Sequence, residues 1–414
     1  MSTEDRPDAE SDVAAATASA VERATFVRIV TRPDGDALAA SGIVARALEA
    51  RGTPFQVTVG RTIRERTERA AVDRGDDGSD LTLVVGAVDG DVTRLDAGDR
   101  PATLEAADLA TELGTPAEPA LALAGLVAAG VDPGAGETEW LLERALESGA
   151  VERRPGVAIP TADPVDGLAH STRLRAPWSG EFEATRTALA EVGVRDLEAA
   201  DGDAEAIDGD DHRTIASLVA LDVVAAEDAS ERAADVVAGA LRPYATLETD
   251  APFETVGGFA DVLEATAQTE PGTGVALAMG RSAAEPALDA WRDHGRRAHG
   301  ALDGASTGRY DGLFVVGIDD GPIETVARLA ADYRSPEPVA LAIGDGEVGI
   351  ATTDGRALGG PLEAIVRDLE ADAGLDCEYD VGRRRGYLRA GGRDGDSDAD
   401  LDDSELITIV RDRL

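Results

Sequence analysis

The chain has 414 residues, enough for two or three domains, and carries 81 acidic residues against 39 basic ones, a net charge of -42. Every basic residue is Arg, and aromatic residues make up only 3% of the chain. The single cysteine, Cys377, excludes a disulfide framework and a cysteine-based zinc site, and no apolar run is long enough to span a membrane.

The charge indicates where the protein works rather than what it does. Self-repulsion of this size destabilises a compact chain in dilute buffer and is a property of salt-adapted proteins. At molar salt the Debye length is about 3 Å, so the repulsion is almost fully screened. We therefore expect a soluble protein of a high-salt cytoplasm, with no membrane partner. The charge neither supports nor excludes a DNA partner, because counterion release is weak in high salt.

The first half of the chain predicts an α/β domain over residues 25–200, preceded by an acidic tail or loose helix over residues 1–24. Strand patterns at Phe26–Val30, 55–59 and 81–88 alternate with helical stretches, which is typical of a parallel sheet covered by helices. The helix after the first strand should end at Gly52. Further helices are predicted over residues 118–130 and 137–148.

The turn between the first strand and its helix, Thr31 to Ala37, carries two acids, Asp34 and Asp36. Pro33 fixes the approach to this turn, and Gly35 should let the chain turn sharply between the acids. Carboxylates beside the free N–H groups of a helix N-terminus can hold a divalent cation against a phosphate. The alternative is an acidic turn without a ligand.

A helical connecting region is predicted over residues 201–300. The acids of residues 201–203 and 208–211 should form a solvated surface loop. Gly257-Gly258 and the stretch of residues 271–274 are predicted to be turns. His294 and His299 lie near Arg292, Arg296 and Arg297 and predict a solvated basic helix face.

The last part predicts a small α/β domain over residues 301–392, followed by an acidic linker and a terminal apolar element over residues 393–414. Its pattern is strand 313–318, helix 322–333, strands 339–343 and 348–352 with a hairpin at Asp345-Gly346, and helix 361–371. Leu406–Val410 should add a strand to a sheet edge or dock on a partner, and more simply it completes the sheet of its own domain.

Several segments resemble a known family. Residues 33–37 and the helix after them resemble the first motif of the DHH phosphoesterase superfamily, which includes the RecJ exonucleases. Residues 153–161, 166–172 and 327–333 resemble, in the same order, segments of its archaeal RecJ-like branch. The resemblance extends over residues 25–392. It implies a DHH-type parallel-sheet domain followed by a smaller C-terminal α/β domain.

The chain departs from that family at its metal ligands. Val30 stands where the first motif of active members has a metal-binding His, and the acids Asp89 and Asp91 follow the later strand with no His nearby. Ser171 stands where a further Asp is expected. The Gly-rich, His-containing substrate loop of the family has no match, and the nearest candidate is Gly382–Gly386. A two-metal phosphodiesterase needs two cations held about 3.5–4 Å apart. We expect Asp34 and Asp36 to bind at most one weak cation, Mn²⁺ or Mg²⁺, or none.

The resemblance implies a protein of DNA replication or repair whose catalytic centre is degenerate. It would bind single-stranded DNA or act as a scaffold with GINS and MCM, as the inactive eukaryotic DHH-fold subunit does, or with a second RecJ-like chain. The first alternative is a manganese-dependent exonuclease specific for single strands. Another is a small-phosphoester hydrolase.

No catalytic residue is assigned from the sequence. The predicted nucleic-acid contacts are Arg32 and the run Arg383, Arg384 and Arg385, because a guanidinium fork matches two phosphate oxygens. The run could equally pair with neighbouring carboxylates. The predicted cleft residues are Asp89, Asp91, Asp163, Asp166, His170 and Ser171. His170 is expected to be a structural or pocket-lining imidazole.

Overall fold

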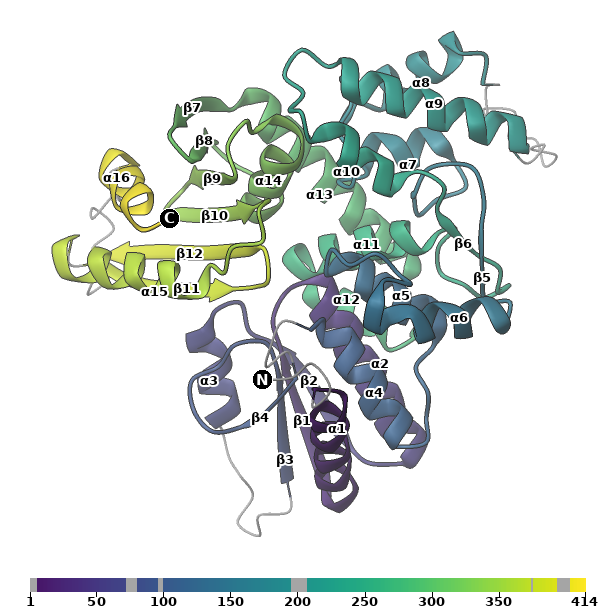
Figure 1. The fold of residues 1–414 in the computed structure, drawn as a ribbon, viewed down its shortest axis with the longest axis vertical. Coiled ribbons are helices and arrows are strands. Elements are labelled where there is room, and N and C mark those ends of the chain that lie inside the picture. The colour runs from purple at the N-terminus through teal and green to yellow at the C-terminus, as the bar shows by residue number, and fades with distance from the viewer. Residues whose placement is uncertain (1–5, 72–79, 96–99, 195–206, 374, 393–402) are drawn as a thin grey trace. The chain divides into compact units, whose positions relative to one another are not determined.

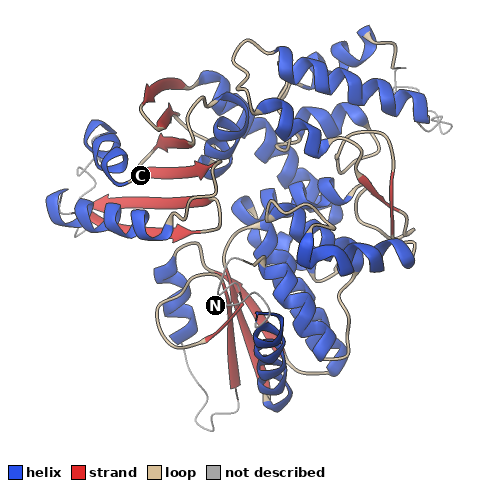
Figure 2. Cartoon of the chain, viewed as in Figure 1, coloured by secondary structure: helices blue, strands red, loops and turns tan. Residues whose placement is uncertain are grey.

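The fold is known from a computed structural model that describes residues 6–71, 80–95, 100–194, 207–373, 375–392 and 403–414 (Figures 1 and 2). The acids predicted at residues 201–203 lie outside the described residues. The chain divides into two compact units. The first contains residues 1–152 and 245–290, and the second contains residues 153–244 and 291–414. The prediction of consecutive segments did not include this return of the chain to its first unit.

The first unit consists of a small sheet and many helices. Its elements are α1 (Arg6–Arg23), β1 (Phe26–Thr31), α2 (Gly35–Arg51), β2 (Phe55–Val59), α3 (Ile63–Ala71), β3 (Asp80–Val85), β4 (Thr93–Leu95), α4 (Ala102–Glu112), α5 (Pro119–Ala128), η1 (Gly136–Thr138), α6 (Glu139–Glu147), α11 (Val256–Thr269) and α12 (Pro271–Ala278). Strand β5 (Val151–Arg153), strand β6 (Tyr244–Thr246) and helix α13 (Ala284–Gly304) carry the chain across the division.

The sheet of the first unit is fully parallel, as predicted, and its strand order is β2-β1-β3-β4. Val27 of β1 lies opposite Phe55 of β2 on one side and Leu81 of β3 on the other. Most apolar residues of β1 and β3, from Val27 to Val30 and from Leu83 to Val85, are buried because the helices of a parallel sheet cover both faces. The carboxyl ends of these strands deliver the loops that hold the candidate site.

Helix α2 is the central helix of this unit. Asp34 caps its N-terminus and Gly52, with φ of 72°, ends it as predicted. Because α2 packs against α4, α5, α11 and α12, nearly every residue from Gly35 to Leu48 is buried. Small residues allow this close packing: a Cβ on Gly42 would lie 2.6 Å from the carbonyl oxygen of Ala278.

The second unit combines several helices with a larger sheet. Its elements are α7 (Pro164–His170), α8 (Phe182–Glu191), α9 (Gly209–Ala225), α10 (Ala233–Ala240), β7 (Ser306–Tyr310), β8 (Leu313–Gly317), α14 (Ile323–Leu329), the π-helix η2 (Ala330–Arg334), β9 (Val339–Gly344), β10 (Glu347–Thr352), α15 (Gly359–Asp368), the π-helix η3 (Leu369–Ala373), β11 (Leu375–Val381), β12 (Arg385–Gly392) and α16 (Asp403–Arg413).

The larger sheet has six strands in the order β11-β12-β10-β9-β8-β7, and only β8 and β9 are parallel. Alternate residues face two different cores. Val316 belongs to the core shared with α7, α9 and α10, whereas Val315 belongs to the core under α15 and α16. The predicted elements 313–318, 322–333, 339–343, 348–352 and 361–371 are confirmed, whereas β7, β11 and β12 were missed.

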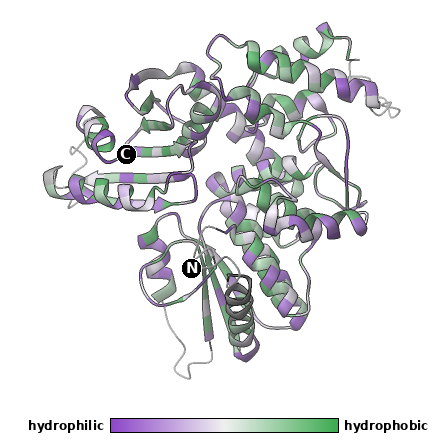
Figure 3. Cartoon of the chain, viewed as in Figure 1, coloured by the Kyte–Doolittle hydropathy of each residue, from purple (hydrophilic) through white to green (hydrophobic). Residues whose placement is uncertain are grey.

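The terminal apolar element is a helix, so the predicted strand at Leu406–Val410 was wrong. Leu406 and Val410 are fully buried against the core of the C-terminal sheet, because a spacing of four residues puts both on one face of α16. In Figure 3, α16 carries both apolar (green) and polar (purple) residues. The segment therefore docks on its own domain, as a helix rather than a strand.

Three other local predictions were wrong. Gly257-Gly258 and residues 271–274 lie within α11 and α12, and a Cβ on Gly274 would lie 2.6 Å from Cδ1 of Leu38 in α2. Asp208 caps α9, and Asp210 and Asp211 form its first turn, so the predicted loop is wrong there, although Asp208 and Asp210 are exposed as predicted. His294 and His299 are buried, not solvated. Among the described residues, no helix is both long and apolar enough to cross a membrane.

Candidate functional site

Asp34 is the N-cap of α2. Its Oδ1 accepts a 2.7 Å hydrogen bond from the N–H of Ala37, and its extended backbone lets the chain turn from β1 into the helix. The side chain is only 2% exposed. Its carboxylate is also ion-paired with the guanidinium of Arg32. Asp34 therefore starts the helix that follows the first strand.

Asp36 caps a different helix. Its Oδ2 accepts a 2.9 Å bond from the N–H of Ala102, and its Oδ1 accepts a 2.9 Å bond from the N–H of Thr103. These are the first two residues of α4, whose own N-cap, Pro101, offers no side-chain bond. The hydroxyl of Thr103 donates to the carbonyl of Asp36. Both carboxylate oxygens of Asp36 are thus used to join α2 to α4.

Arg32 provides positive charge inside this site. Its side chain is buried and lies beside Asp34, and its N–H donates to the carbonyl of Val85 on β3. Gly86, with φ of 114°, leaves the space that the Arg32 side chain fills: a Cβ there would lie 3.1 Å from Cδ of Arg32. Arg32 was predicted to contact nucleic acid, but its side chain is only 5% exposed and is not offered to an external strand.

Glu264 of α11 fills the position where an external anion would approach α2. Its Oε2 accepts a 2.9 Å bond from the N–H of Gly35, the first residue of α2, and its Oε1 accepts a bond from the side chain of Gln268. Free N–H groups at a helix N-terminus bind anions. Here the anion is a carboxylate of the chain itself, and Glu264 is 8% exposed.

Gly35 is needed for packing rather than for a turn. It is the first helical residue and has no positive φ, contrary to the predicted sharp turn between the acids. A Cβ on Gly35 would lie 2.8 Å from Cβ of Ala128 and 3.3 Å from Oε2 of Glu264. The absence of a side chain therefore lets α5 and α11 approach the start of α2.

Burial raises the pKa of Asp36 above its ordinary value, and the neighbouring charge of Asp34 raises it further. The positive charge of Arg32 and the bonds from Thr103 oppose this shift. Two carboxylates in one buried site share a single guanidinium, which is consistent with the upward shift of the Asp36 pKa. The site therefore stabilises Asp34 and Asp36 with N–H groups and Arg32 rather than with a cation.

The residues present do not fit a metal centre. Manganese or magnesium needs several oxygen or imidazole ligands that converge on one point. No group of three or more His, Cys, Asp or Glu side chains in the described ranges is arranged to hold an ion. Val30, in the position of the family's His, is buried with Ala70, Val84 and Val88 in an apolar cluster.

Asp89 and Asp91 do not complete the site. Both are exposed, and Asp89 is fixed by its own N–H, which donates to the hydroxyl of Thr67. They follow β3 in sequence, as predicted, but they belong to the solvated loop after it. Arg66 holds that loop from inside: its guanidinium donates to the carbonyls of Ala87 and Gly60.

A second group of predicted residues meets in the second unit. Asp166 of α7 accepts bonds of 3.0 and 3.2 Å from Nε of Arg292 and of 3.0 Å from its Nη2. Nδ1 of His170 lies 3.1 Å from Oδ1 of Asp166, and its ring packs edge-on against Trp291. Burial alone would raise the pKa of Asp166, but the bonds from His170 and Arg292 outweigh it and lower the pKa.

The other residues of that predicted cleft are structural. Asp163 caps α7 through a 2.9 Å bond from the N–H of Val165. Ser171 ends α7, is fully buried, and its carbonyl is 2.9 Å from Nε2 of His299. His294 lies 3.0 Å from the hydroxyl of Thr325. These contacts join α7 and α14 to α13, and none forms a metal-ligand group.

The arginine run lies at the turn between β11 and β12. Arg383 and Arg384 occupy the turn and Arg385 begins β12. Arg384 is exposed, and its Nε donates to the carbonyl of Thr352. It remains a predicted nucleic-acid contact.

Sequence reasoning missed Glu264 and Arg292 as site residues. Glu264 lies 229 residues from its partner Gly35, and nothing local marks an acid within an apolar helix as a cap for another helix. Arg292 was noted only as part of a solvated face. The one available signal was the position of each residue among apolar neighbours on helical spacing, which predicts burial.

The comparisons with known proteins agree with this fold. A family model described as "Uncharacterized protein rrnAC1427, C-terminal domain" matches residues 305–412. The uncharacterized protein rrnAC1427 of Haloarcula marismortui is 45% identical over 359 residues, and the match covers 86% of this chain and 88% of that protein.

Two solved structures are similar over almost the whole chain. CDC45 from Entamoeba histolytica has a TM-score of 0.63 at 8% identity, covering 97% of this chain and 98% of that one. RecJ in complex with Mn²⁺ from Thermus thermophilus has a TM-score of 0.47 at 15% identity, covering 98% of this chain and 53% of that one. The first of these similarities shows a shared fold.

Proposed function

Because the chain belongs to the family of rrnAC1427 and has a DHH/RecJ-like fold, we propose that it is a non-catalytic DHH-fold protein of DNA replication or repair. It acts as a scaffold or a single-strand-binding subunit rather than as a nuclease. The proposal includes GINS, MCM or a second RecJ-like chain as partners, and a high-salt cytoplasm as the place of action.

The observation that supports this proposal is the use of the first-motif acids. Asp34 caps α2, Asp36 caps α4, Arg32 supplies the countercharge, and Glu264 occupies the anion position at the start of α2. A two-metal mechanism needs those carboxylates as ligands and that position for a phosphate. Each of these groups is already bonded within the chain.

A nuclease assay tests the catalytic part. Wild-type protein with Mn²⁺, labelled single-stranded DNA and molar potassium chloride should give no degradation above a protein-free control. The matched variants are Asp36→Asn, at the buried site, and Asp89→Asn, in the exposed loop. Degradation that is lost in Asp36→Asn and kept in Asp89→Asn would overturn the proposal and support the manganese-dependent exonuclease.

Calorimetry with Mn²⁺ in the same salt tests the metal part separately. We expect no tight binding, because the ligands of a divalent ion do not converge. Two tight sites in each chain would restore the catalytic interpretation even if the DNA substrate of the nuclease assay were the wrong one.

Single-stranded DNA binding would use the turn between β11 and β12. Arg384 is exposed there, whereas Arg389 of β12 is ion-paired with Glu378 and serves as a matched control. Arg384→Gln should weaken binding and lower the salt dependence by about one phosphate contact. Equal loss in Arg389→Gln, or no binding by wild-type protein at any salt concentration, would contradict this assignment.

Affinity purification in the native salt tests the partner part. Tagged protein should recover a replication factor, with GINS and MCM as the named candidates, or a different RecJ-like chain. Recovery of the chain with no replication protein would contradict the scaffold role.

A further inference from the structure

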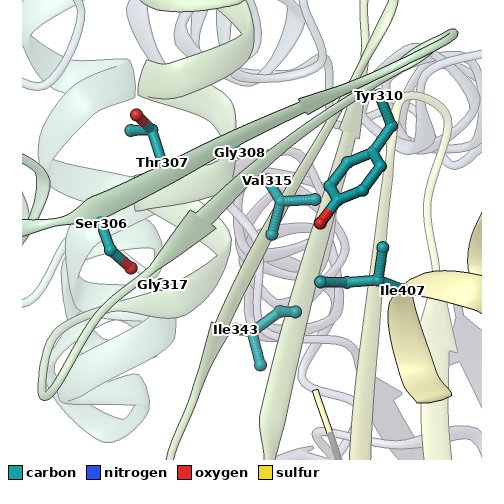
Figure 4. A pocket seen from close by; sticks show the side chains of 8 residues that line it. All are labelled: Ser306, Thr307, Gly308, Tyr310, Val315, Gly317, Ile343 and Ile407. Atoms are coloured by element: carbon teal, nitrogen blue, oxygen red, sulfur yellow. The ribbon is translucent and has the colours of Figure 1, made fainter. Parts of the chain in front are cut away.

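A hollow of about 210 Å³ lies beside β7 of the C-terminal sheet (Figure 4). Uncharged residues of β7, β8, β9 and α16 line it, and the hydroxyl of Tyr310 points toward Ile407 there. None of these lining residues would select a ligand by its charge. Positive charge without an internal partner lies instead around β5 and β6, which pair in a two-stranded sheet (Figure 1).

Two exposed arginines lie next to each other at this small sheet. Arg153 ends β5 and Arg242 lies just before β6, and both belong to the second unit. Nε of Arg153 donates a 3.1 Å bond to the carbonyl of Arg242. Within the described ranges neither guanidinium is ion-paired, and the exposed Glu152 that precedes Arg153 does not pair with it. In a chain with 81 acids and 39 arginines, this pair is a local site of positive charge.

Tyr244 holds the guanidinium of Arg153 in place. Cζ of Arg153 lies 5.2 Å from the centroid of the Tyr244 ring, and Nη1 of Arg153 lies 3.4 Å from the Tyr244 hydroxyl. A cation is attracted to the face of an aromatic ring in this arrangement. Since Nε and Nη1 are used within the chain, Nη2 of Arg153 keeps two N–H groups that bond to no other described residue.

The backbone of Arg242 is strained. Its φ is 55°, and Asp345 in a hairpin turn is the only other described residue besides glycines with a positive φ. Pro243 also disfavours this conformation in the residue before it. The N–H of Arg242 donates a 3.0 Å bond to the carbonyl of Gly156, which helps to hold the strained backbone. A glycine would adopt this φ at no steric cost, and strain at a residue with a side chain is typical of ligand-binding sites.

We propose that Arg153 and Arg242 bind neighbouring phosphates of a single-stranded nucleic acid, with an unpaired base stacked on the guanidinium of Arg153. The proposal rests on the single-strand-binding role proposed above and adds a contact surface to the β11–β12 turn. Guanidinium forks match phosphate oxygens, and unpaired bases stack on guanidinium planes. Arg32 is neutralised within the chain by Asp34, whereas the charge of Arg153 and Arg242 is left for an outside anion.

Fluorescence anisotropy of labelled oligothymidylate with the full chain, over a range of potassium chloride concentrations, tests the proposal. Arg153→Gln and Arg242→Gln should each weaken binding about 5-fold. Each should also lower the slope of log affinity against log salt by about 0.7, the value of one phosphate contact on a single strand. The control is Arg296→Gln, which removes the same charge from an exposed arginine of the same unit that is ion-paired with Asp293. It should bind like the wild type.

Two further variants separate binding from structure. Arg242→Gly should raise the thermal midpoint, because glycine relieves the strain, and should still weaken binding as Arg242→Gln does. Arg153→Lys keeps the charge but loses the planar group, so it should bind oligothymidylate more weakly than the wild type. Unchanged binding by Arg242→Gly would overturn the role of Arg242, and wild-type affinity in Arg153→Lys would overturn the stacked base.

The remaining outcomes distinguish this surface from the proposed function. Equal losses in Arg296→Gln, or unchanged binding in folded Arg153→Gln and Arg242→Gln, would overturn the surface. If binding is then lost in Arg384→Gln alone, the single-strand-binding role stands and its contact is the β11–β12 turn. No binding by wild-type protein at any salt concentration would overturn both. Circular dichroism confirms that each variant is folded.

Discussion

The Asp34–Asp36 turn of the first unit and the Asp166 cluster of the second unit both bury carboxylates, but they balance the charges differently. Two carboxylates share Arg32 and a set of backbone N–H groups in the first, and the pKa of Asp36 is raised. One carboxylate receives both Arg292 and His170 in the second, and its pKa is lowered. Asp36 is the more deeply buried of the two, and burial is the main cause of its raised pKa; at Asp166 the bonds from His170 and Arg292 outweigh burial and lower the pKa.

The largest expected effect comes from removing the two arginines. Arg32→Gln leaves Asp34 and Asp36 buried without a countercharge, which should lower the free energy of unfolding by about 3–5 kcal/mol. Arg292→Gln should cost about 1–2 kcal/mol, since Arg292 is one-third exposed and His170 stays beside Asp166. Denaturation in molar potassium chloride measures both. The exposed pair of Arg281 and Glu49 supplies the control Arg281→Gln. Equal losses of the free energy of unfolding in Arg32→Gln and Arg292→Gln would contradict the difference that we infer between the two sites.

A second prediction concerns the rigidity of the Asp166 region. A Cβ on Gly295 of α13 would lie 1.9 Å from the carbonyl oxygen of His170, so Gly295→Ala should lower the free energy of unfolding by about 2–3 kcal/mol. Gly300 lies in the same helix, and a Cβ there would have no neighbour within 4 Å. Gly300→Ala should therefore stabilise the protein by up to about 1 kcal/mol. A mild effect at Gly295 would show that α7 can move away from α13.

A third prediction tests the internal anion at α2. Glu264→Ala removes the acceptor of the Gly35 N–H and should lower the free energy of unfolding by about 1–3 kcal/mol. Glu264→Gln keeps one carbonyl oxygen and should cost less. Thermal denaturation of the two variants is the measurement. If both variants match the wild type, Glu264 does not stabilise the start of α2.

The smallest expected effect is the change of folding stability with pH. The raised pKa of Asp36 means that the folded chain binds this proton more readily, so its contribution to stability falls as pH rises from 3.8 through the folded value. The lowered pKa of Asp166 has the opposite sign: its contribution is present above 3.8 and is lost as pH falls through the folded value. Carbon-13 NMR of the two carboxyl groups in molar salt measures both. A measured pKa of Asp36 that lies below that of Asp166 would contradict this prediction.

The fold class was readable because its signals are local. Phe26 to Val30 is a continuous apolar run, Gly52 stops the next helix, and hydrophobic spacing marks the strands and helices that follow. Leu406–Val410 was misread because a short run of β-branched residues favours a strand by propensity, although Leu406 and Val410 pack as one helix face on the sheet. Tertiary packing decided that element.

The candidate site could be located from the sequence but not explained by it. Asp34 and Asp36 were named from the sequence as possible ligands of one weak cation, and in the structure they cap α2 and α4. The partners of Asp36, Ala102 and Thr103, lie more than sixty residues away, and no local rule links an acid to the start of a later helix. Arg neighbours made His294 and His299 look solvated, because the sequence does not show which side of α13 is covered.

The return of the chain to its first unit affects how the protein is made. Gly35 and Glu264 are 229 residues apart, and the intervening chain includes α7 to α10 of the second unit. When the ribosome has released only residues up to 152, the strands of the parallel sheet have been synthesised. Helices α11 and α12, which pack on α2, have not yet been translated. One face of α2 in the nascent N-terminal segment therefore stays uncovered until a large part of the second unit has been synthesised. That interval, with apolar surface of α2 exposed, is the point at which a chaperone would have most to protect.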